Sequence, residues 1–263
     1  MVACAREHDD ASPTDGGASG AAEPLRGRLT VFAASSLTEA FTAIATAFER
    51  EHASLRVECN FASSSALATQ VEQGAPADVF ASADGPQMQR VARQGLLAGD
   101  AVTFARTALV IAARTDGSPR IDTPHDLARP AVRIVFAARD VPIGTYARQA
   151  LARLGADPAY GAAYERAVLS NVVSEEANVR AVLAKVELGE ADAGIVYATD
   201  VRSAGPRVRA IAIPEAANVV AHYPIATLRD ARNPPAAAAF VTYVTGPDGQ
   251  GILRDAGFLT GGA

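Results

Sequence analysis

The sequence predicts an α/β protein of two lobes, in which each lobe is a mostly parallel sheet flanked by helices. From Arg28 onward, short runs of β-branched residues alternate with amphipathic helical runs, the pattern of parallel βαβ units. The 263 residues exceed what one small domain needs and suffice for two lobes of ordinary size. Hydrophobic residues make up 49% and charged residues 20%, which is typical of a globular protein with a sizeable core.

Lobe I is expected to begin with a strand at residues 29–33, followed by a helix at about 37–51. The apolar positions of this helix recur at three-to-four spacing. The elements expected next are a strand at 55–61, a helix at 66–73, a short strand at 78–81 and a helix at 86–94, which a terminating Gly95 follows.

Lobe II is expected to follow without any internal repeat. Its elements are strands at 107–113 and 132–136, helices at 145–154 and 175–188, strands at 193–197 and 208–213, and an extended run at 218–226. Two helices at 235–244 and 248–255 close the chain. Crossings near residues 105–112 and 216–225 would make lobe I residues 28–106 plus 222–263, and lobe II residues 107–221.

The first 27 residues are rich in Ala, Gly, Ser, Asp and Pro and have no hydrophobic periodicity, which predicts a disordered tether. Within it, Val2-Ala3-Cys4 resembles the end of a bacterial lipoprotein signal, where the cysteine becomes the lipidated first residue. The apolar region that should precede this cysteine is absent, which implies a longer leader. Lipidation of Cys4 and an unmodified tether both stay open. The sequence has no run of about 18 apolar residues, so it predicts no transmembrane helix.

Charge and residue spacing exclude several functions. The net charge of −5, with no concentrated basic segment, argues against a nucleic-acid partner. The four histidines (His8, His52, His125 and His222) share no metal-ligand spacing. Cys59 lies in an alternating segment and is interpreted as a small buried hydrophobe.

Five segments carry short serine, glycine or tyrosine motifs in a definite order. They are VFAASSLT at residues 31–38, FASSS at 61–65, GAPADVFASAD at 74–84, VPIGTYA at 141–147 and GIVY at 194–197. In order and spacing, across about residues 29–260, they resemble the molybdate-binding proteins of ABC importers. The resemblance implies a periplasmic-binding-protein-like fold with its ligand in the cleft between the lobes.

In that family two serine hydroxyls, backbone amides and one tyrosine hydroxyl hold the oxyanion. The matching positions in this chain are Ser36, Ser64, Ile143, Val179 and Tyr197, with Ile143 and Val179 acting through backbone N–H groups. The stretch at 174–179 follows the family pattern only loosely. The resemblance further implies a non-enzymatic monomer without cofactors or side-chain metal ligands. It would lie outside the cytoplasm, periplasmic or lipid-anchored, and deliver molybdate or tungstate to a permease and its ATPase.

These residue types suit a doubly charged oxyanion. Ser36, Ser64, Ile143 and Val179 are each expected at or near a helix start, where N–H groups lack partners and the macrodipole is positive. At roughly half an elementary charge per helix end, four ends would offset a charge of −2. A protonated anion such as hydrogen phosphate would leave its O–H unpaired among donors, at a cost of about 1–3 kcal/mol. Sulfate could be excluded only by size.

Each of these residues also has a plainer interpretation. Ser35, Ser36 and the serines at 63–65 could be helix caps or turn residues, and Tyr197 could be packing at a strand end. Asp78 and Asp84 are interpreted as structural, Asp84 as a helix cap. Glu175 and Glu176 are expected to favour a helix N-terminus through the dipole, with a direct role at a six-coordinate metal as a minor alternative.

Three alternative functions stay open. The first is a binding protein for another oxyanion such as sulfate or phosphate. The second is a serine hydrolase with Ser36 or Ser64 as nucleophile, although neither serine lies in a Gly-x-Ser-x-Gly motif or beside a histidine. The third is the effector domain of a transcription regulator, which is disfavoured because no helix-turn-helix precedes residue 28.

Overall fold

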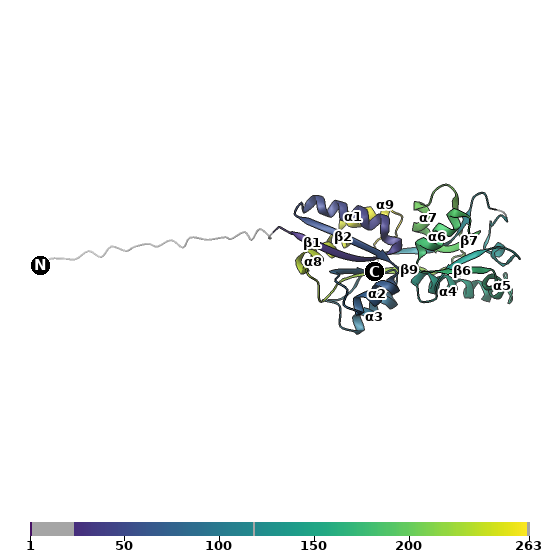
Figure 1. Cartoon of the computed structure of the whole chain (residues 1–263), viewed down its shortest axis with the longest axis horizontal. Coiled ribbons are helices and arrows are strands. Elements are labelled where there is room, and N and C mark those ends of the chain that lie inside the picture. Colours follow the sequence, from purple (N-terminus) through teal and green to yellow (C-terminus); the bar gives the residue numbers. More distant parts are fainter. Residues whose placement is uncertain (2–23, 118, 262–263) are drawn as a thin grey trace.

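The computed structural model describes Met1, residues 24–117 and residues 119–261. These form two lobes lying end to end, each built on a sheet between helices (Figure 1). The predicted α/β fold class is thus confirmed. Cys4 and residues 2–23 of the predicted tether lie outside the described residues, so both of those expectations stay predictions.

Strands and helices alternate through most of the chain, as the sequence predicts. The strands are β1 (Gly27–Ala34), β2 (Leu55–Ala62), β3 (Val79–Ala81), β4 (Val102–Arg114), β5 (Ile134–Ala137), β6 (Val172–Glu176), β7 (Ala193–Tyr197), β8 (Val208–Ala212) and β9 (Val220–Thr227). The α-helices are α1 (Thr38–Glu51), α2 (Ser64–Glu72), α3 (Gly85–Arg93), α4 (Pro142–Ala156), α5 (Tyr164–Ser170), α6 (Val179–Leu188), α7 (Ala198–Ser203), α8 (Pro234–Thr245) and α9 (Pro247–Asp255). Two 3₁₀ helices, η1 (Ser35–Leu37) and η2 (Pro124–Ala128), complete the set.

The strands follow the order β2-β1-β3-β9-β4-β7-β5-β6, and β8 pairs with β4. Strand β1 is parallel to β2 and β3, and β5 is parallel to β6 and β7. The pairings made by β4 and β9 are antiparallel. The sheet is therefore more mixed than the sequence predicts, because the two strands that connect the lobes run against their neighbours.

Strand β4 runs through both lobes, and β9 returns the chain to the sheet of lobe I. From Val102 to Ala108, β4 pairs with β9, and from Leu109 onward it pairs with β7 and β8. The first half of β4 thus belongs to the sheet of lobe I and the second half to that of lobe II. Both predicted boundaries, 106/107 and 221/222, fall inside these strands, and their exact residues stay a prediction.

The core of lobe I lies on both faces of its sheet. Helices α1 and α9 lie over one face, and α2 and α3 lie over the other (Figure 1). The buried side of α1 presents Phe41, Ile44 and Phe48, and the Phe48 ring packs edge-on against Phe240 of α8 at 5.4 Å between centroids. Burial of each such side chain stabilises the fold by about 1.5–3 kcal/mol, which fixes the position of the chain segment that precedes α1.

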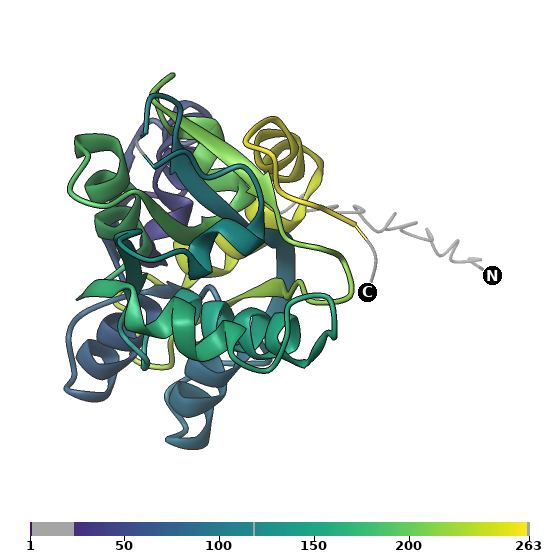
Figure 2. The same cartoon turned by 90° about the vertical axis from the view of Figure 1, so that its right-hand side faces the viewer.

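In lobe II, α6 and α7 cover one face of the sheet and α4 and α5 the other (Figure 1). Figure 2 looks onto this lobe from its outer end and shows its helices on both sides of the sheet. Gly144 explains how closely α4 approaches β5, because a Cβ there would lie 2.0 Å from the carbonyl oxygen of Ala138. Only glycine lets the first turn of α4 pack this near the strand end.

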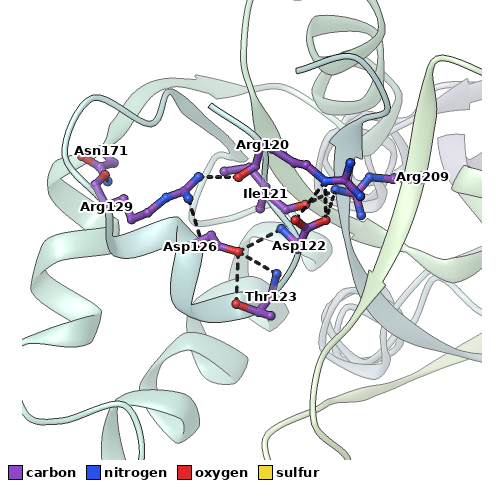
Figure 3. Close-up of polar contacts among 8 residues, drawn as sticks. All are labelled: Arg120, Ile121, Asp122, Thr123, Asp126, Arg129, Asn171 and Arg209. Atoms are coloured by element: carbon purple, nitrogen blue, oxygen red, sulfur yellow. Dashed lines mark hydrogen bonds and ion pairs between the residues drawn. The ribbon is translucent and has the colours of Figure 1, made fainter. Parts of the chain in front are cut away.

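The segment between β4 and β5 has little regular structure and is held by polar contacts (Figure 3). The Asp126 carboxylate accepts hydrogen bonds from the backbone N–H groups of Asp122 at 2.9 Å and Thr123 at 2.8 Å. Arg209 of β8 donates to the Asp122 carboxylate at 2.8 Å. Asn171 donates to carbonyl oxygens of the same segment, so the outer end of lobe II is tied to its sheet.

The predicted helix at 175–188 begins later than expected. Glu175 and Glu176 end strand β6, and helix α6 starts only at Val179. The Glu176 carboxylate pairs with Lys185 at 2.8 Å, and Glu175 pairs with Arg148. Their predicted role at a helix N-terminus is therefore wrong, because sheet pairing with β5 overrides the helical pattern there. Helices α5 and α7 were not predicted; both are short.

None of the helices within the described ranges combines the length and the apolar character that a membrane crossing requires.

Candidate functional site

One small cavity lies where the two lobes meet, and all five predicted site residues line it. Its volume, counting the part that is open to solvent, is about 190 Å³, which leaves room only for a small ligand. The lining residues are Ala34, Ser35, Ser36, Ala62, Ser63, Ser64 and Ala83 from lobe I, with Val141, Pro142, Ile143, Val179 and Tyr197 from lobe II. The cavity therefore fits a small ligand held by both lobes.

The cavity lies at the carboxyl ends of six strands. In lobe I its lining follows β1, β2 and β3, and in lobe II it follows β5 and β6 and ends β7. Ligands of open α/β sheets bind beyond the carboxyl ends of parallel strands, because the helices that follow begin there. The predicted residues of both lobes meet for this topological reason.

Helix starts surround the cavity. Ser64 and Val179 are the first residues of α2 and α6, Ile143 is the second residue of α4, and Ser36 lies in the 3₁₀ turn that leads into α1. Four N-terminal N–H groups of a helix lack intrahelical acceptors, and the dipole is positive at that end. The expected placement of these four residues at or near helix starts is confirmed.

The capping residues leave the foremost amides of two helices available. Ser63 accepts from the N–H of Ala66 at 3.3 Å, and Asn178 accepts from that of Ala181 at 3.0 Å. Each cap thus uses the third N–H of its helix. The first amides of α2 and α6 belong to Ser64 and Val179, both of which line the cavity.

The protein itself makes a hydrogen bond to each of the two cavity serines. For Ser64 the protein group is the donor, and for Ser36 either oxygen could be the donor. The backbone N–H of Ala83 donates to Ser64 Oγ at 2.9 Å. Ser36 Oγ lies 3.0 Å from the hydroxyl oxygen of Tyr223, a buried tyrosine of β9. Because Ser64 already accepts from an amide, its hydroxyl hydrogen is free to donate to a ligand.

The Tyr197 hydroxyl is buried and makes no hydrogen bond within the described part of the chain. Burial also raises its pKa well above the ordinary value, so the phenol stays protonated. A buried polar hydrogen without a partner costs free energy. An acceptor in the adjoining cavity would remove that cost, which makes Tyr197 a strong candidate donor.

A carboxyl group lies directly behind Tyr197. The Tyr197 N–H donates to Asp200 Oδ2 at 3.1 Å. Burial raises the pKa of Asp200 to about 7, although Arg180, whose Nε lies 3.6 Å from Oδ1, opposes the shift. Asp200 does not line the cavity, so its charge bears on the site through Tyr197 and Arg180.

No ionisable side chain other than Tyr197 is among the described residues that line the cavity. The guanidinium of Arg180, next to Val179, bridges the lobes. It pairs with Glu39 of α1, donates to the Ser35 carbonyl oxygen at 3.3 Å and to Ser203 Oγ at 2.9 Å. Its charge is thus balanced by carboxylates outside the cavity, and the cavity itself offers neutral donors.

The acidic residues set aside from the site are structural, as expected. Asp84 caps α3 by accepting from the N–H of Gln87 at 3.0 Å. Asp78 accepts from the N–H groups of Thr30 at 2.7 Å and Asn233 at 2.9 Å, joining β1 to the C-terminal helices. Glu175 and Glu176 do not line the cavity, and residues 24–117 and 119–261 contain no cluster of His, Cys, Asp or Glu suited to a metal ion.

The cavity lining contains no histidine that could act as a base for Ser36 or Ser64. His52 packs on Phe48 and His125 stacks on Tyr160, both away from the cavity, while His222 is exposed. Cys59 is free and half-buried, and burial raises its pKa to about 12, which keeps the thiol protonated.

Sequence reasoning missed Ala83, Tyr223, Arg180 and Asp200. Ala83 and Tyr223 act on the two serines, while Arg180 and Asp200 lie behind Val179 and Tyr197. Arg180 is adjacent to a predicted residue, which is a weak signal. Tyr223 lies in strand β9, Asp200 in helix α7 and Ala83 within the motif at 74–84, and only the three-dimensional contacts show what each of them does.

Two α/β lobes joined by two strands, with a small cavity of converging donors between them, define a solute-binding protein of the periplasmic type. Comparison with protein families agrees: residues 29–259 match the bacterial extracellular solute-binding protein family. The chain is 41% identical to the molybdate-binding protein ModA of Mycobacterium tuberculosis over 260 residues, 98% of this chain and 92% of the relative. It belongs to this solute-binding family, and within it to the ModA proteins.

A second relative and a solved structure extend the comparison. ModA of Escherichia coli is 38% identical over 242 residues, 88% of this chain and 89% of the relative. The periplasmic molybdate-binding protein of Azotobacter vinelandii has a TM-score of 0.74 at 21% identity, covering 89% of this chain and all (100%) of that one. At this identity the structural likeness supports the fold alone.

Proposed function

We propose that this protein captures molybdate or tungstate and delivers it to the permease of an ABC importer. The observation that carries the proposal is a small cavity between the lobes that presents neutral hydrogen-bond donors and no cationic side chain. Hydroxyls of Ser36, Ser64 and Tyr197, with the amides of Ile143 and Val179, are the proposed ligands. Membership of the ModA proteins supports this choice of anion.

The donor set favours a fully ionised oxyanion. The helix starts at the cavity together supply roughly +2, which offsets a dianion without a buried counter-ion. Each charge-assisted hydrogen bond from a hydroxyl contributes about 1.5–3 kcal/mol. Hydrogen phosphate carries an O–H that needs an acceptor, and sulfate is smaller than molybdate. The binding of either one as the main ligand is the alternative function.

Both lobes contribute donors, so the anion would favour the closed arrangement. Lobe I, residues 28–106 plus 222–263, would supply Ser36 and Ser64, and lobe II, residues 107–221, would supply the others. A ligand shifts a conformational equilibrium only by its differential affinity for the two forms. We propose that the permease recognises the closed form, and that the protein works as a non-enzymatic monomer outside the cytoplasm, periplasmic or anchored through Cys4.

Isothermal titration calorimetry with molybdate, tungstate, sulfate and phosphate tests the proposal. Tight binding of the first two with little heat from the others is expected. If sulfate or phosphate bound more tightly than molybdate, the alternative function would be the correct one. Incubation with a serine-reactive phosphonate is expected to leave the protein unlabelled, and an adduct at Ser36 or Ser64 would instead indicate a hydrolase.

Small-angle X-ray scattering tests the closure step separately. The radius of gyration is expected to fall when molybdate is added, because only the closed form lets both lobes contact one anion. An unchanged radius, with binding established by calorimetry, would contradict the closure step and leave the choice of ligand intact.

A further inference from the structure

The Tyr223 side chain contacts a cavity residue from each lobe without lining the cavity itself. It lies on β9, which pairs with β3 and with the first half of β4 in the sheet of lobe I. Its hydroxyl oxygen is 3.0 Å from Ser36 Oγ. Its ring packs edge-on against the Tyr197 ring at 5.7 Å between centroids. One fully buried side chain therefore adjoins two of the three hydroxyls proposed to bind the anion.

The surroundings of this hydrogen bond determine its direction, although either oxygen could donate by geometry alone. The phenol hydrogen of Tyr223 is buried and needs an acceptor. Phe104 and Phe258 offer none. The Tyr197 hydroxyl, although close enough to lower the Tyr223 pKa slightly, makes no hydrogen bond with it by distance and angle. If Ser36 were the donor, the phenol hydrogen would be buried without a partner, whereas the Ser36 hydrogen has the cavity to donate into.

We infer that Tyr223 is a positioning residue, an inference that rests on the proposed function. It donates to Ser36 Oγ and so leaves the Ser36 hydrogen as the group that this serine presents to the anion. Burial raises the Tyr223 pKa well above its ordinary value, so the phenol keeps its proton at neutral pH. The orientation of Ser36 is thereby fixed before the ligand arrives.

Ser64 shows the same arrangement with a different donor. The N–H of Ala83 donates to Ser64 Oγ at 2.9 Å, and an amide can act only as a donor. With Tyr223 donating to Ser36, both serines have an acceptor site filled by the protein. Hydrogen bonds in series also polarise one another, which strengthens the outer donor. The cavity then discriminates against anions that carry a proton.

A double-mutant cycle on molybdate affinity tests whether Tyr223 acts through Ser36. Tyr223→Phe is expected to weaken molybdate binding about 3- to 10-fold, the range of one neutral hydrogen bond. In the Ser36→Ala background the same change is expected to alter Kd by less than about twofold, because the group that Tyr223 orients is gone. Fully multiplicative effects would overturn the inference.

A selectivity measurement provides a second readout. Without Tyr223 donating, the Ser36 hydroxyl is free to rotate and to turn a lone pair toward a protonated anion, so Tyr223→Phe should weaken molybdate more than it weakens hydrogen phosphate in competition titrations. The ratio of molybdate to sulfate affinity should stay the same, because neither anion carries a proton. An unchanged molybdate-to-phosphate ratio would overturn the inference.

A third measurement needs no ligand and separates failure of this inference from failure of the proposed function. The ¹³Cζ chemical shift of Tyr223, which reports its hydrogen bond, is expected to change in Ser36→Ala and to stay constant in Ser64→Ala. A constant shift in both variants would overturn the inference even if molybdate binds tightly. Absence of molybdate binding to the unaltered protein would overturn the proposed function, while the shift still decides the contact.

Tyr164→Phe is the matched control for general effects of removing a buried phenol hydroxyl. Tyr164 is buried in lobe II, and its hydroxyl donates to the Pro124 carbonyl oxygen at 2.6 Å, away from the cavity. This variant is expected to keep the molybdate affinity of the unaltered protein. An equal loss in Tyr164→Phe and Tyr223→Phe would assign the effect to packing and contradict a role through Ser36.

Discussion

Removing the Tyr197 hydroxyl should weaken anion binding without weakening the fold. The hydroxyl is buried and has no partner within the described residues, so the ligand-free protein gains nothing from it. In the complex it would donate one charge-assisted hydrogen bond, worth about 1.5–3 kcal/mol. At 1.4 kcal/mol per tenfold change, Tyr197→Phe is expected to raise the Kd for molybdate roughly 10- to 150-fold.

Calorimetric titration and thermal unfolding, run on the same preparations, measure the two sides of this prediction. The ligand-free melting temperature of Tyr197→Phe should equal or slightly exceed that of the unaltered protein. Tyr164→Phe should show the reverse pattern, with unchanged affinity and a stability loss of about 1 kcal/mol, because its hydroxyl has a protein acceptor. A Kd for Tyr197→Phe within twofold of the original, or a lowered melting temperature, would refute the reasoning.

Three other variants give different signatures. Ser64→Ala should weaken molybdate binding roughly 10- to 150-fold and also destabilise the protein by about 1–3 kcal/mol, since the Ala83 N–H loses its acceptor. Gly144→Ala should lower both the melting temperature and the affinity, because its Cβ would meet backbone atoms at 2.0 Å and 2.6 Å and displace the start of α4. Asp200→Asn should flatten the pH dependence of stability: the folded carboxyl has a pKa of about 7 instead of 3.8, so the unfolding free energy falls between about pH 4 and 7, by on the order of 4 kcal/mol.

Each of these variants has a control or a contrary outcome. Ser65→Ala changes a serine of the same helix that does not line the cavity, and it should keep its affinity. Gly251→Ala, where the added Cβ would meet only an arginine side-chain atom at 3.9 Å, should be neutral or stabilising. If Asp200→Asn kept the full loss of stability between pH 4 and 7 in urea titrations, another group would have to be responsible.

The order of elements could be predicted because each local pattern agrees with its tertiary setting. Helix α1 has apolar residues at regular spacing, and burial of Phe41 and Phe48 uses that spacing. The prediction was wrong at Glu175 and Glu176, where pairing of β6 with β5 prevails over residues that also suit a helix. It was incomplete at β4, whose early residues pair with β9, a strand more than 100 positions away in the sequence.

The candidate site also has a part that the sequence predicts and a part that it does not. Four of the predicted cavity residues, Ser36, Ser64, Ile143 and Tyr197, lie in recognisable motifs at strand ends, so a resemblance could indicate them before the structure was known. Val179 lies in a stretch that follows the family pattern only loosely. The groups that orient them could not be found in this way. Ser36 and Tyr223 are 187 positions apart, and Ser35 and Arg180 are 145 apart. The first contact depends on how distant strands of one lobe come together and the second on how the lobes pack, and no local pattern encodes either.

A crystal structure of the complex with molybdate tests the central claim most directly, that neutral donors from both lobes balance a dianion. The expected complex has the hydroxyls of Ser36, Ser64 and Tyr197 and the amides of Ile143 and Val179 within hydrogen-bond distance of the oxyanion, with Arg180 still paired to Glu39. A guanidinium in direct contact with the anion, or hydroxyls turned away from it, would contradict the account.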